Sequence, residues 1–295
     1  MRVSATSFAA LLVLGSVTLA STGCDCAGPP PRRCVTNADC TGGRTCLDGT
    51  CVAGMDAAGI DGGASDGRPP SDGRIPVVVS IAIMPASPTV TSVDGATATV
   101  DLDVIATYDD GSTASITTAF WTADAPVLGA IDRDTGVYTA SCAIAGTTTV
   151  EVDALSMIAT TTVTVRIERT SLAPGVPADA PTRFGSPVTD ASLEASLLYP
   201  LESTVFPQNV RPADVQWRTD RGVAGDLFRV RTETTGVRVD AYVLHSGAGF
   251  GFGWLPDDAT WRVIAESAPE APVTIAVDRW VATTGTHVAG PVRTV

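Results

Sequence analysis

The sequence contains no lysine: all 19 of its basic residues are arginines, and 32 acidic residues give it a formal net charge of −13. An acidic surface repels phosphate backbones, so nucleic acid is not expected as a partner. Histidine is scarce as well, with only His245 and His287. The sequence has no His-Glu-x-x-His zinc helix and no Gly-x-Ser-x-Gly nucleophile elbow. It therefore predicts no catalytic residue, no metal ligand and no cofactor, and the protein is not expected to be an enzyme.

Long apolar runs and helical periodicity are also rare. Beyond the first 23 residues, no apolar stretch approaches the ~20 residues that a membrane-spanning helix needs. Asp258–Ser267 is the one segment typical of a helix, with Asp257 or Asp258 as its N-cap and Pro269 after its end. The adjacent carboxylates of Asp257 and Asp258 could serve glycoside hydrolysis in principle, but they fit a helix cap better.

The chain begins with a segment typical of export. Arg2 precedes the apolar run Phe8–Ala20, and Ser21 to Cys24 close it with small residues. This arrangement resembles a bacterial lipoprotein leader, although such leaders usually carry Leu, Val or Ile where Ser21 stands. The resemblance implies removal of residues 1–23 and a lipid on Cys24 that anchors the protein to a membrane, with the leaflet left open. An ordinary cleaved signal peptide, with Cys24 free or disulfide-bonded, is the alternative.

Six of the seven cysteines lie in residues 24–52, which are too short and too polar to form a core without cross-links. Zinc sites favour closer cysteine pairs than these, so disulfides are preferred over a metal, with three connectivities open. Cys26 and Cys142 remain; they either bond to each other or leave a buried Cys142 thiol, which is the favoured alternative. The module is similar to cysteine-rich modules that follow the leader of bacterial surface lipoproteins. The four cysteines expected to form its two disulfides are Cys34, Cys40, Cys46 and Cys51.

Residues 53–76 are rich in Gly, Asp, Ser, Ala and Pro and show no hydrophobic period. Such a segment has no core to offset the entropy of ordering it, so we expect a disordered linker. Its acidic residues are too sparse for an EF-hand calcium loop. With a reach of roughly 25–30 Å, this linker would hold the following domains clear of a membrane.

From Val77 the chain changes to short segments in which small or apolar residues alternate with polar ones, separated by turn signals. This pattern is typical of strands in a β-sandwich, which we place at residues 77–169. Trp121 is expected in its core rather than as a sugar-binding platform, and Asp109 and Asp110 as turn residues rather than calcium ligands. The clearest expected strands are Ala96–Tyr108, Val137–Ala140, Thr147–Val152 and Thr161–Ile167.

The order of these segments resembles a bacterial Ig-like domain of group 2. The resemblance implies an extracellular, non-catalytic module that serves as a spacer or binding unit, and it assigns no ligand residue. The matching segments are Val79–Ile81 with Pro85, Ala106–Ser112, Trp121–Thr122, Ile131–Asp132, Thr135–Val137, Thr139–Ala140, Ala145–Thr147 and Val163–Val165.

Residues 170–190 are rich in Pro and Ala and are expected to link this domain to a second sandwich at residues 191–295. The second domain resembles fibronectin type III through Pro200, the segment Val215–Trp217 and the late strand Val273–Val277. Its clearest alternating segments are Phe228–Glu233, Val237–Val243 and Val273–Asp278.

Two features of the second domain suggest binding. Phe250, Phe252 and Trp254 alternate with glycines and could contact a sugar, although the same alternation is typical of a core-facing strand, which we favour. Several arginines could bind anionic glycans, but acidic neighbours can pair with them, so we expect a solvated, cross-paired face. The arginines are Arg218, Arg221, Arg229, Arg231 and Arg238, and the acids are Asp220, Asp226, Glu233 and Asp240.

The sequence thus predicts an all-β protein: two tandem Ig-like β-sandwiches after a signal peptide, a small disulfide-rich module and a disordered linker. We expect an exported, lipid-anchored protein of the cell envelope whose non-catalytic domains act in adhesion, ligand presentation or spacing. Its expected partners are the membrane, through the lipid, and an envelope glycan or surface protein. The alternative is the non-catalytic N-terminal part of a larger surface enzyme or β-propeller, because Gly290–Val295 breaks off within an expected strand.

Overall fold

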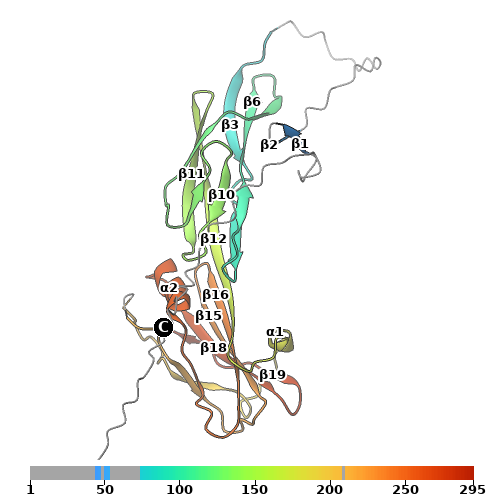
Figure 1. Ribbon diagram of the computed structural model, residues 1–295. Helices are drawn as coiled ribbons and strands as arrows, with labels where there is room; N and C mark the ends of the chain where they lie inside the picture. The colour runs from blue at the N-terminus through green and yellow to red at the C-terminus, as the bar shows by residue number, and fades with distance from the viewer. Residues whose placement is uncertain (1–43, 48–49, 54–73, 208–209) are drawn as a thin grey trace, which may run out of the picture.

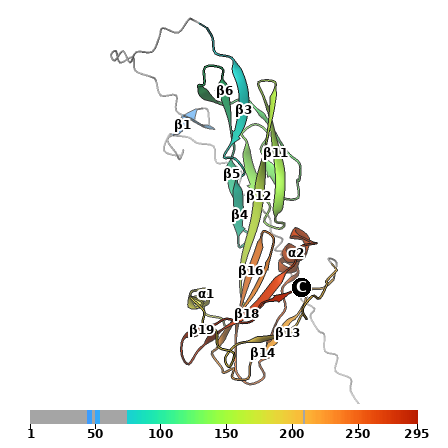
Figure 2. The same cartoon turned by 180° about the vertical axis from the view of Figure 1, so that it is seen from behind.

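The structure is a computed structural model that describes residues 44–47, 50–53, 74–207 and 210–295. Two β-sandwiches stand end to end in an elongated molecule (Figures 1 and 2). In the cysteine-rich segment, β1 (Arg44–Leu47) and β2 (Thr50–Ala53) form an antiparallel hairpin in which Cys46 stands opposite Cys51. The expected signal peptide, the lipidation site Cys24 and most of the expected linker lie outside the described residues.

The first sandwich consists of two layers. One layer holds β8, β11, β12 and β4, and the other holds the ladders β3-β6-β7 and β5-β10-β9. The strands are β3 (Val78–Met84), β4 (Thr89–Val93), β5 (Thr99–Asp101), β6 (Asp103–Tyr108), β7 (Thr113–Ile116), β8 (Phe120–Ala123), β9 (Gly129–Ile131), β10 (Val137–Ala140), β11 (Gly146–Ala154) and β12 (Met157–Leu172).

The segment predicted as one strand from Ala96 to Tyr108 is divided in the structure. It breaks at Leu102, so that β5 pairs with β10 while β6 pairs with β3 and β7. The Leu102 N–H donates to the Gly136 carbonyl (3.1 Å), a bond that lies outside both ladders. The prediction that the small and apolar side chains of this segment face the core is nevertheless confirmed, because Leu102, Val104 and Ala106 are all buried. The two short strands therefore contribute one continuous inner face.

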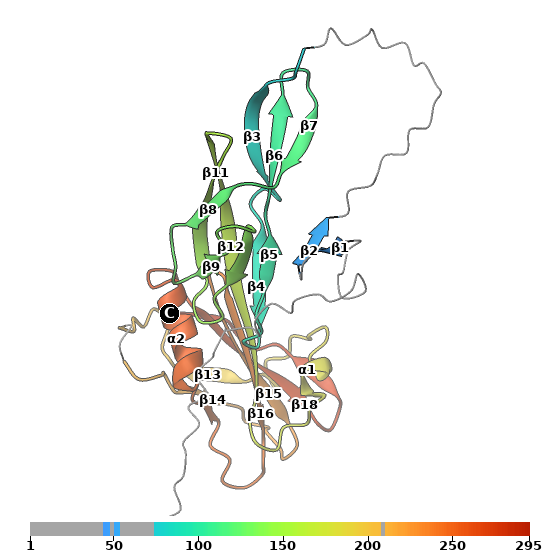
Figure 3. The ribbon, with the colours of Figure 1, turned by 45° about the horizontal axis from the view of Figure 1, so that its top comes forward.

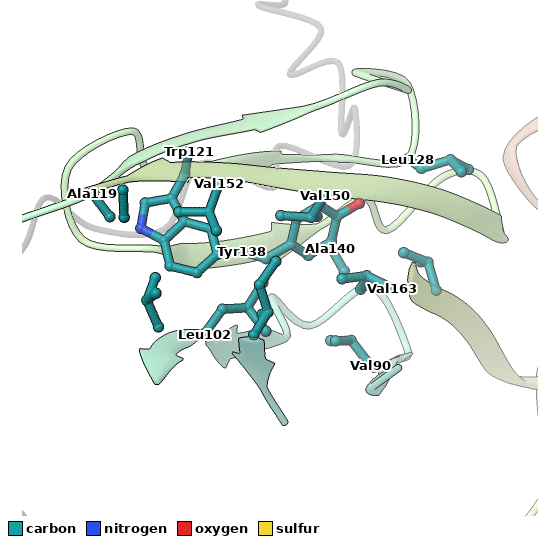
Figure 4. Packing of buried hydrophobic residues seen from close by; sticks show 14 residues of the cluster. Val90, Leu102, Ala119, Trp121, Leu128, Tyr138, Ala140, Val150, Val152 and Val163 are labelled. Atoms are coloured by element: carbon teal, nitrogen blue, oxygen red, sulfur yellow. The ribbon is translucent and has the colours of Figure 1, made fainter. Parts of the chain in front are cut away.

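Trp121 lies in the core between the two layers. It is 4% exposed, and Figure 4 shows its indole beside Val152 and Ala119. Tyr138 fills the same core, and burial raises the pKa of its hydroxyl to about 12. The prediction that Trp121 is a core residue is confirmed.

The second sandwich has β15, β16, β18 and β19 in one layer and β13-β14-β17 in the other, with α2 along one side (Figure 3). The all-β prediction is confirmed for the described residues. Its elements are α1 (Ala180–Arg183), β13 (Ser196–Tyr199), β14 (Val215–Arg218), β15 (Leu227–Thr234), β16 (Val237–Leu244), β17 (Gly253–Trp254), α2 (Asp258–Ser267), β18 (Thr274–Val281), β19 (Thr286–Val288) and β20 (Arg293–Thr294).

The helix α2 begins where the sequence predicts. Asp257 is the N-cap, and its Oδ1 accepts a hydrogen bond from the Thr260 N–H at 2.6 Å. A cap of this kind satisfies one of the N–H groups that the first turn leaves without a helical partner. Val263 and Ile264 form the buried side of the helix, which fixes α2 against the sandwich.

The connection between the sandwiches is packed along the second one. The connection begins after β12 and includes α1, where Ala180 is fully buried. Phe184 follows α1 and is 7% exposed. The Val188 N–H donates to the His287 carbonyl (2.8 Å), which joins the connection to β19. The segment predicted as a linker therefore covers part of the outer face of the β15-β18 layer.

The prediction of one strand across the glycine-rich aromatic segment, residues 249–254, is wrong. Only Gly253 and Trp254 form a strand, β17, which pairs with β14. Gly247 and Gly249 adopt positive φ angles of 109° and 83°, which turn the backbone out of extended geometry just before Phe250.

Candidate functional site

Strand β12 belongs to both sandwiches. Its first half pairs with β11 from Met157 to Val165, and its second half pairs in parallel with β16 from Ile167 to Leu172. Because β16 continues along the edge that β11 leaves, one hydrogen-bonded sheet extends through both domains (Figure 1). No flexible connection lies between the two sandwiches at this strand.

Apolar side chains fill the junction around β12. Ile167 on β12 and Val237 on β16 are opposite each other in register and pack with Val263 and Ile264 of α2; all four are at most 4% exposed. The Ala145 N–H of the first sandwich also donates to Ser267 Oγ of α2 at 2.9 Å. We call these five side chains and the Ala145 amide the junction cluster. It fixes the orientation of one sandwich on the other.

The three aromatic residues singled out in the sequence do not form one exposed platform. The rings of Phe250 and Phe252 lie 4.8 Å apart and pack against Phe228 in the core, at 6.0 and 5.8 Å. Trp254 lies beside α2 and contacts the junction cluster. All three are partly buried. A role for them in sugar binding stays a prediction.

A cavity of about 400 Å³ lies between α2 and the strands β14, β15 and β18 of the second sandwich. We call it the α2 cavity. Trp254, Trp261, Ile264 and Ile275 contribute apolar walls, and Thr232 belongs to its lining. Sites of this volume and composition are typical of small-molecule binding. The sequence gives no local signal for it, since its walls come from segments that lie far apart in the chain, from Thr204 to Val295.

The predicted cross-strand charge pairs are confirmed in part. Asp240 accepts from both Arg231 and Arg238 (2.9 Å each), and Arg238 lies 3.7 Å from Glu233. These four side chains form the expected solvent-facing charge network on the outer face of β15 and β16.

Arg229 and Asp226 are not on a solvated face, contrary to the prediction. Arg229 is 7% exposed, pairs with Asp278 and lies under the ring of Phe184 at 5.0 Å. Asp226 is fully buried and pairs with Arg279. Sequence patterns missed this because the cover over Arg229 comes from the segment predicted as a linker.

Both histidines are buried. His245 packs against Phe250 at 4.7 Å, and its Nδ1 accepts a hydrogen bond from the Gly247 N–H. His287 donates from Nδ1 to the Gly185 carbonyl at 2.7 Å, with Nε2 3.4 Å from Asp278. Each imidazole is thus bound to groups that hold the fold together, and neither forms a triad with a nucleophile in the described part of the chain.

The acidic turn residues already have partners: Asp109 contacts the chain just before β3, and Asp110 bonds within its own turn. Asp109 pairs with Arg74 at 2.8 Å and accepts from the Val77 N–H, while Asp110 accepts from Ser112. Within the described residues, no group of three or more His, Cys, Asp or Glu side chains is placed to hold a metal ion. Neither helix there has the length and apolar character of a membrane span.

Cys142 follows β10 at the base of the first sandwich and is 1% exposed. It is disulfide-bonded, so the favoured expectation of a free buried thiol is wrong. The side chains of the other six cysteines lie outside the described residues.

No protein-family model matches the sequence, and no curated protein matches it. Among solved structures, the chain is similar to domains 5–6 of the S-layer protein SbsC, with 14% identity, 75% of this chain and 97% of that chain covered, and a TM-score of 0.23. It is also similar to the I9–I11 tandem of titin, with 10% identity, coverage of 71% and 65%, and a TM-score of 0.20. Likeness this distant carries no functional argument, and the fold assignment rests on the strands described above.

Proposed function

We propose that the protein is exported, anchored by a lipid on Cys24, and displays its two sandwiches as a rigid, non-catalytic unit that binds or spaces an envelope component. The leader-like start supports export and the linker of residues 53–76 supports display at a distance from the membrane. One observation carries the rigid two-domain unit of this proposal: β12 joins both sandwiches in a single sheet.

The rigidity follows from the cost of bending at the junction. Reorienting the second sandwich would break the β12-β16 ladder and expose the junction cluster, whose apolar side chains are almost fully buried. Burial of such side chains contributes about 1.5–3 kcal/mol each relative to exposure. Two sandwiches joined by an ordinary flexible linker would have no comparable restraint.

Small-angle X-ray scattering of the Cys24→Ser chain tests the rigidity. We expect the described sandwiches to behave as one elongated body at all salt concentrations. A variant with a Gly-Ser hexapeptide inserted between Arg166 and Ile167 serves as the flexible control and should scatter as a mixture of orientations. Identical profiles for the two proteins would contradict the proposal.

The lipid anchor is tested by mass spectrometry of the mature N-terminus. We expect acyl chains on Cys24, and Cys24→Ser should shift the protein from the membrane to the soluble fraction. An unmodified residue at the cleavage site would contradict lipidation while leaving the rigid display untouched.

Binding is tested with the full mature chain in pull-downs from an envelope glycan array and from envelope fractions. A specific glycan or surface protein supports a binding role. If the protein retains no glycan and no envelope protein, the result supports a role as a spacer alone. Hydrolysis of a retained glycan would contradict the non-catalytic assignment.

A further inference from the structure

The α2 cavity has a polar group at its floor that the fold leaves without a partner. Thr232 follows Phe228 and Val230 on the inward face of β15 and is 3% exposed. Its Oγ1 is buried and makes no hydrogen bond within the described residues. The nearby hydroxyls of Thr234 and Thr274, by contrast, both donate to backbone carbonyls. Buried polar groups are nearly always paired, so the Thr232 hydroxyl indicates a missing partner.

The walls of the cavity are apolar and held in place. Trp261 donates from Nε1 to the Val210 carbonyl at 3.2 Å, and its ring packs edge-on against Phe206 at 5.7 Å. Trp254 and Ile275 also line the cavity, and Ile275 stands opposite Thr232 in the register of β15 and β18. A flat ligand can stack on the indole, which favours planar molecules. Because the indole is already held in place, binding orders no further side chain, and a rigid ligand loses little entropy of its own.

The charge around the cavity selects against anions. Glu270, which is exposed at the rim, is the one ionisable side chain in the lining. The chain from Ser171 to Val295 carries 10 arginines against 14 acidic residues, an excess of four negative charges. A carboxylate or sulfonate entering the cavity would meet this field without a cation in the lining to compensate it.

We propose that the α2 cavity binds a neutral or cationic, flat and largely apolar small molecule whose hydrogen-bonding group reaches Thr232. The size of the cavity, its aromatic wall, the unpaired hydroxyl and the acidic rim each support one part of this description. The cavity shares Ile264 with the junction cluster. Dye binding measures the cavity and X-ray scattering measures the rigidity, so a failure of this proposal is distinguishable from a failure of the proposed display function.

Two naphthalene dyes of the same scaffold test the proposal on the full mature chain with Cys24→Ser. N-phenyl-1-naphthylamine is neutral and carries one N–H group, and 8-anilinonaphthalene-1-sulfonate adds an anion. We expect saturable one-to-one binding of the neutral dye, with energy transfer from Trp254 and Trp261, and binding of the sulfonate weaker by about tenfold or more.

Two substitutions locate the dye. Ala265→Trp on α2 fills the cavity and should weaken the neutral dye by about tenfold or more, whereas Ala114→Trp on the exposed face of the first sandwich should leave it unchanged. Thermal unfolding of both variants establishes that they fold. Binding that does not saturate, equal binding of the two dyes, or no effect of Ala265→Trp overturns the proposal.

The Thr232 hydroxyl is tested by Thr232→Val, which keeps the shape of the side chain. We expect about fivefold weaker binding of the neutral dye, the factor that one neutral hydrogen bond typically gives, and no loss of thermal stability. Thr232→Ser should retain binding. Unchanged affinity in Thr232→Val overturns the assignment of the hydroxyl as a ligand contact and assigns it to bound water instead.

Discussion

Arg279 and Asp226 form an ion pair inside the second sandwich, with 2.6 Å between Nη2 of the arginine and Oδ2 of the aspartate. Their side chains are 1% and 0% exposed. The second carboxylate oxygen accepts from the Ala282 N–H, and Arg279 Nη1 donates to Thr219 and to the Leu193 carbonyl. The pair therefore connects β18 with three loops that cover the end of the sandwich.

We predict that Asp226→Ala destabilises the protein by about 3–5 kcal/mol, because it leaves the Arg279 guanidinium buried and uncompensated. Urea unfolding followed by fluorescence measures this change in the free energy of unfolding. Glu266→Ala is the matched control: it removes the partner of Arg262, whose side chain is 70% exposed, and should change stability by about 0.5 kcal/mol or less. Similar effects for the two substitutions would contradict the structural role of the buried pair.

Gly136 closes the turn before β10 at a φ of 74°, and a Cβ built there would lie 2.6 Å from the Leu102 carbonyl oxygen and 2.8 Å from the Trp121 ring. We predict that Gly136→Ala costs more stability than Gly111→Ala. Gly111 has a similar φ of 81° but open space around it, so alanine there should cost only the backbone strain of about 1–2 kcal/mol. Equal losses in denaturant unfolding would contradict the prediction, because they would show that the overlap of the added Cβ with Leu102 and Trp121 costs no stability.

The pKa of Asp132 lies below its usual range, chiefly because its carboxylate accepts a hydrogen bond from the Thr135 N–H, and further because of the Thr135 hydroxyl and the Asp134 N–H. A depressed folded-state pKa gives stability that is present above the unfolded-state value of about 3.9 and is lost as the pH falls through the folded-state pKa. We therefore predict that the free energy of unfolding falls less steeply below about pH 4 in Asp132→Asn than in the unmodified protein. Carboxyl NMR should show Asp132 titrating below this value, and an ordinary midpoint would contradict the prediction.

Cys142 is disulfide-bonded, and all other cysteines of the chain lie between residues 24 and 51. If Cys24 carries the lipid and the four evenly spaced cysteines pair among themselves, Cys26 is the partner that remains. We predict a Cys26–Cys142 bond, which would hold the N-terminal module against the first sandwich. Peptide mapping without reduction should find the two peptides linked, and Cys142→Ser should release them.

A link from Cys142 to Cys34, Cys40, Cys46 or Cys51 would contradict this pairing. It would also show that the four evenly spaced cysteines do not form a closed set. The comparison of reduced and unreduced digests therefore tests the disulfide predictions for the whole module.

Local patterns predicted the strands well where one face is buried along its whole length. Val104 and Ala106 face the core as their alternation indicates, and α2 begins at its predicted cap Asp257. The pattern failed at Phe250, where glycines with positive φ interrupt the strand. Alternation reports which residues avoid water, but it does not report the backbone geometry between them.

The sequence by itself determined the all-β character, the leader-like start, the crowding of cysteines near the N-terminus and the acidic surface, because composition and short-range periodicity encode these properties. The tertiary structure alone decided that β12 serves both sandwiches, that Phe184 covers Arg229, and that Thr232 lies at the floor of a cavity beside α2. Each of these depends on segments many residues apart meeting in one register. No local window of sequence contains both partners of such a contact.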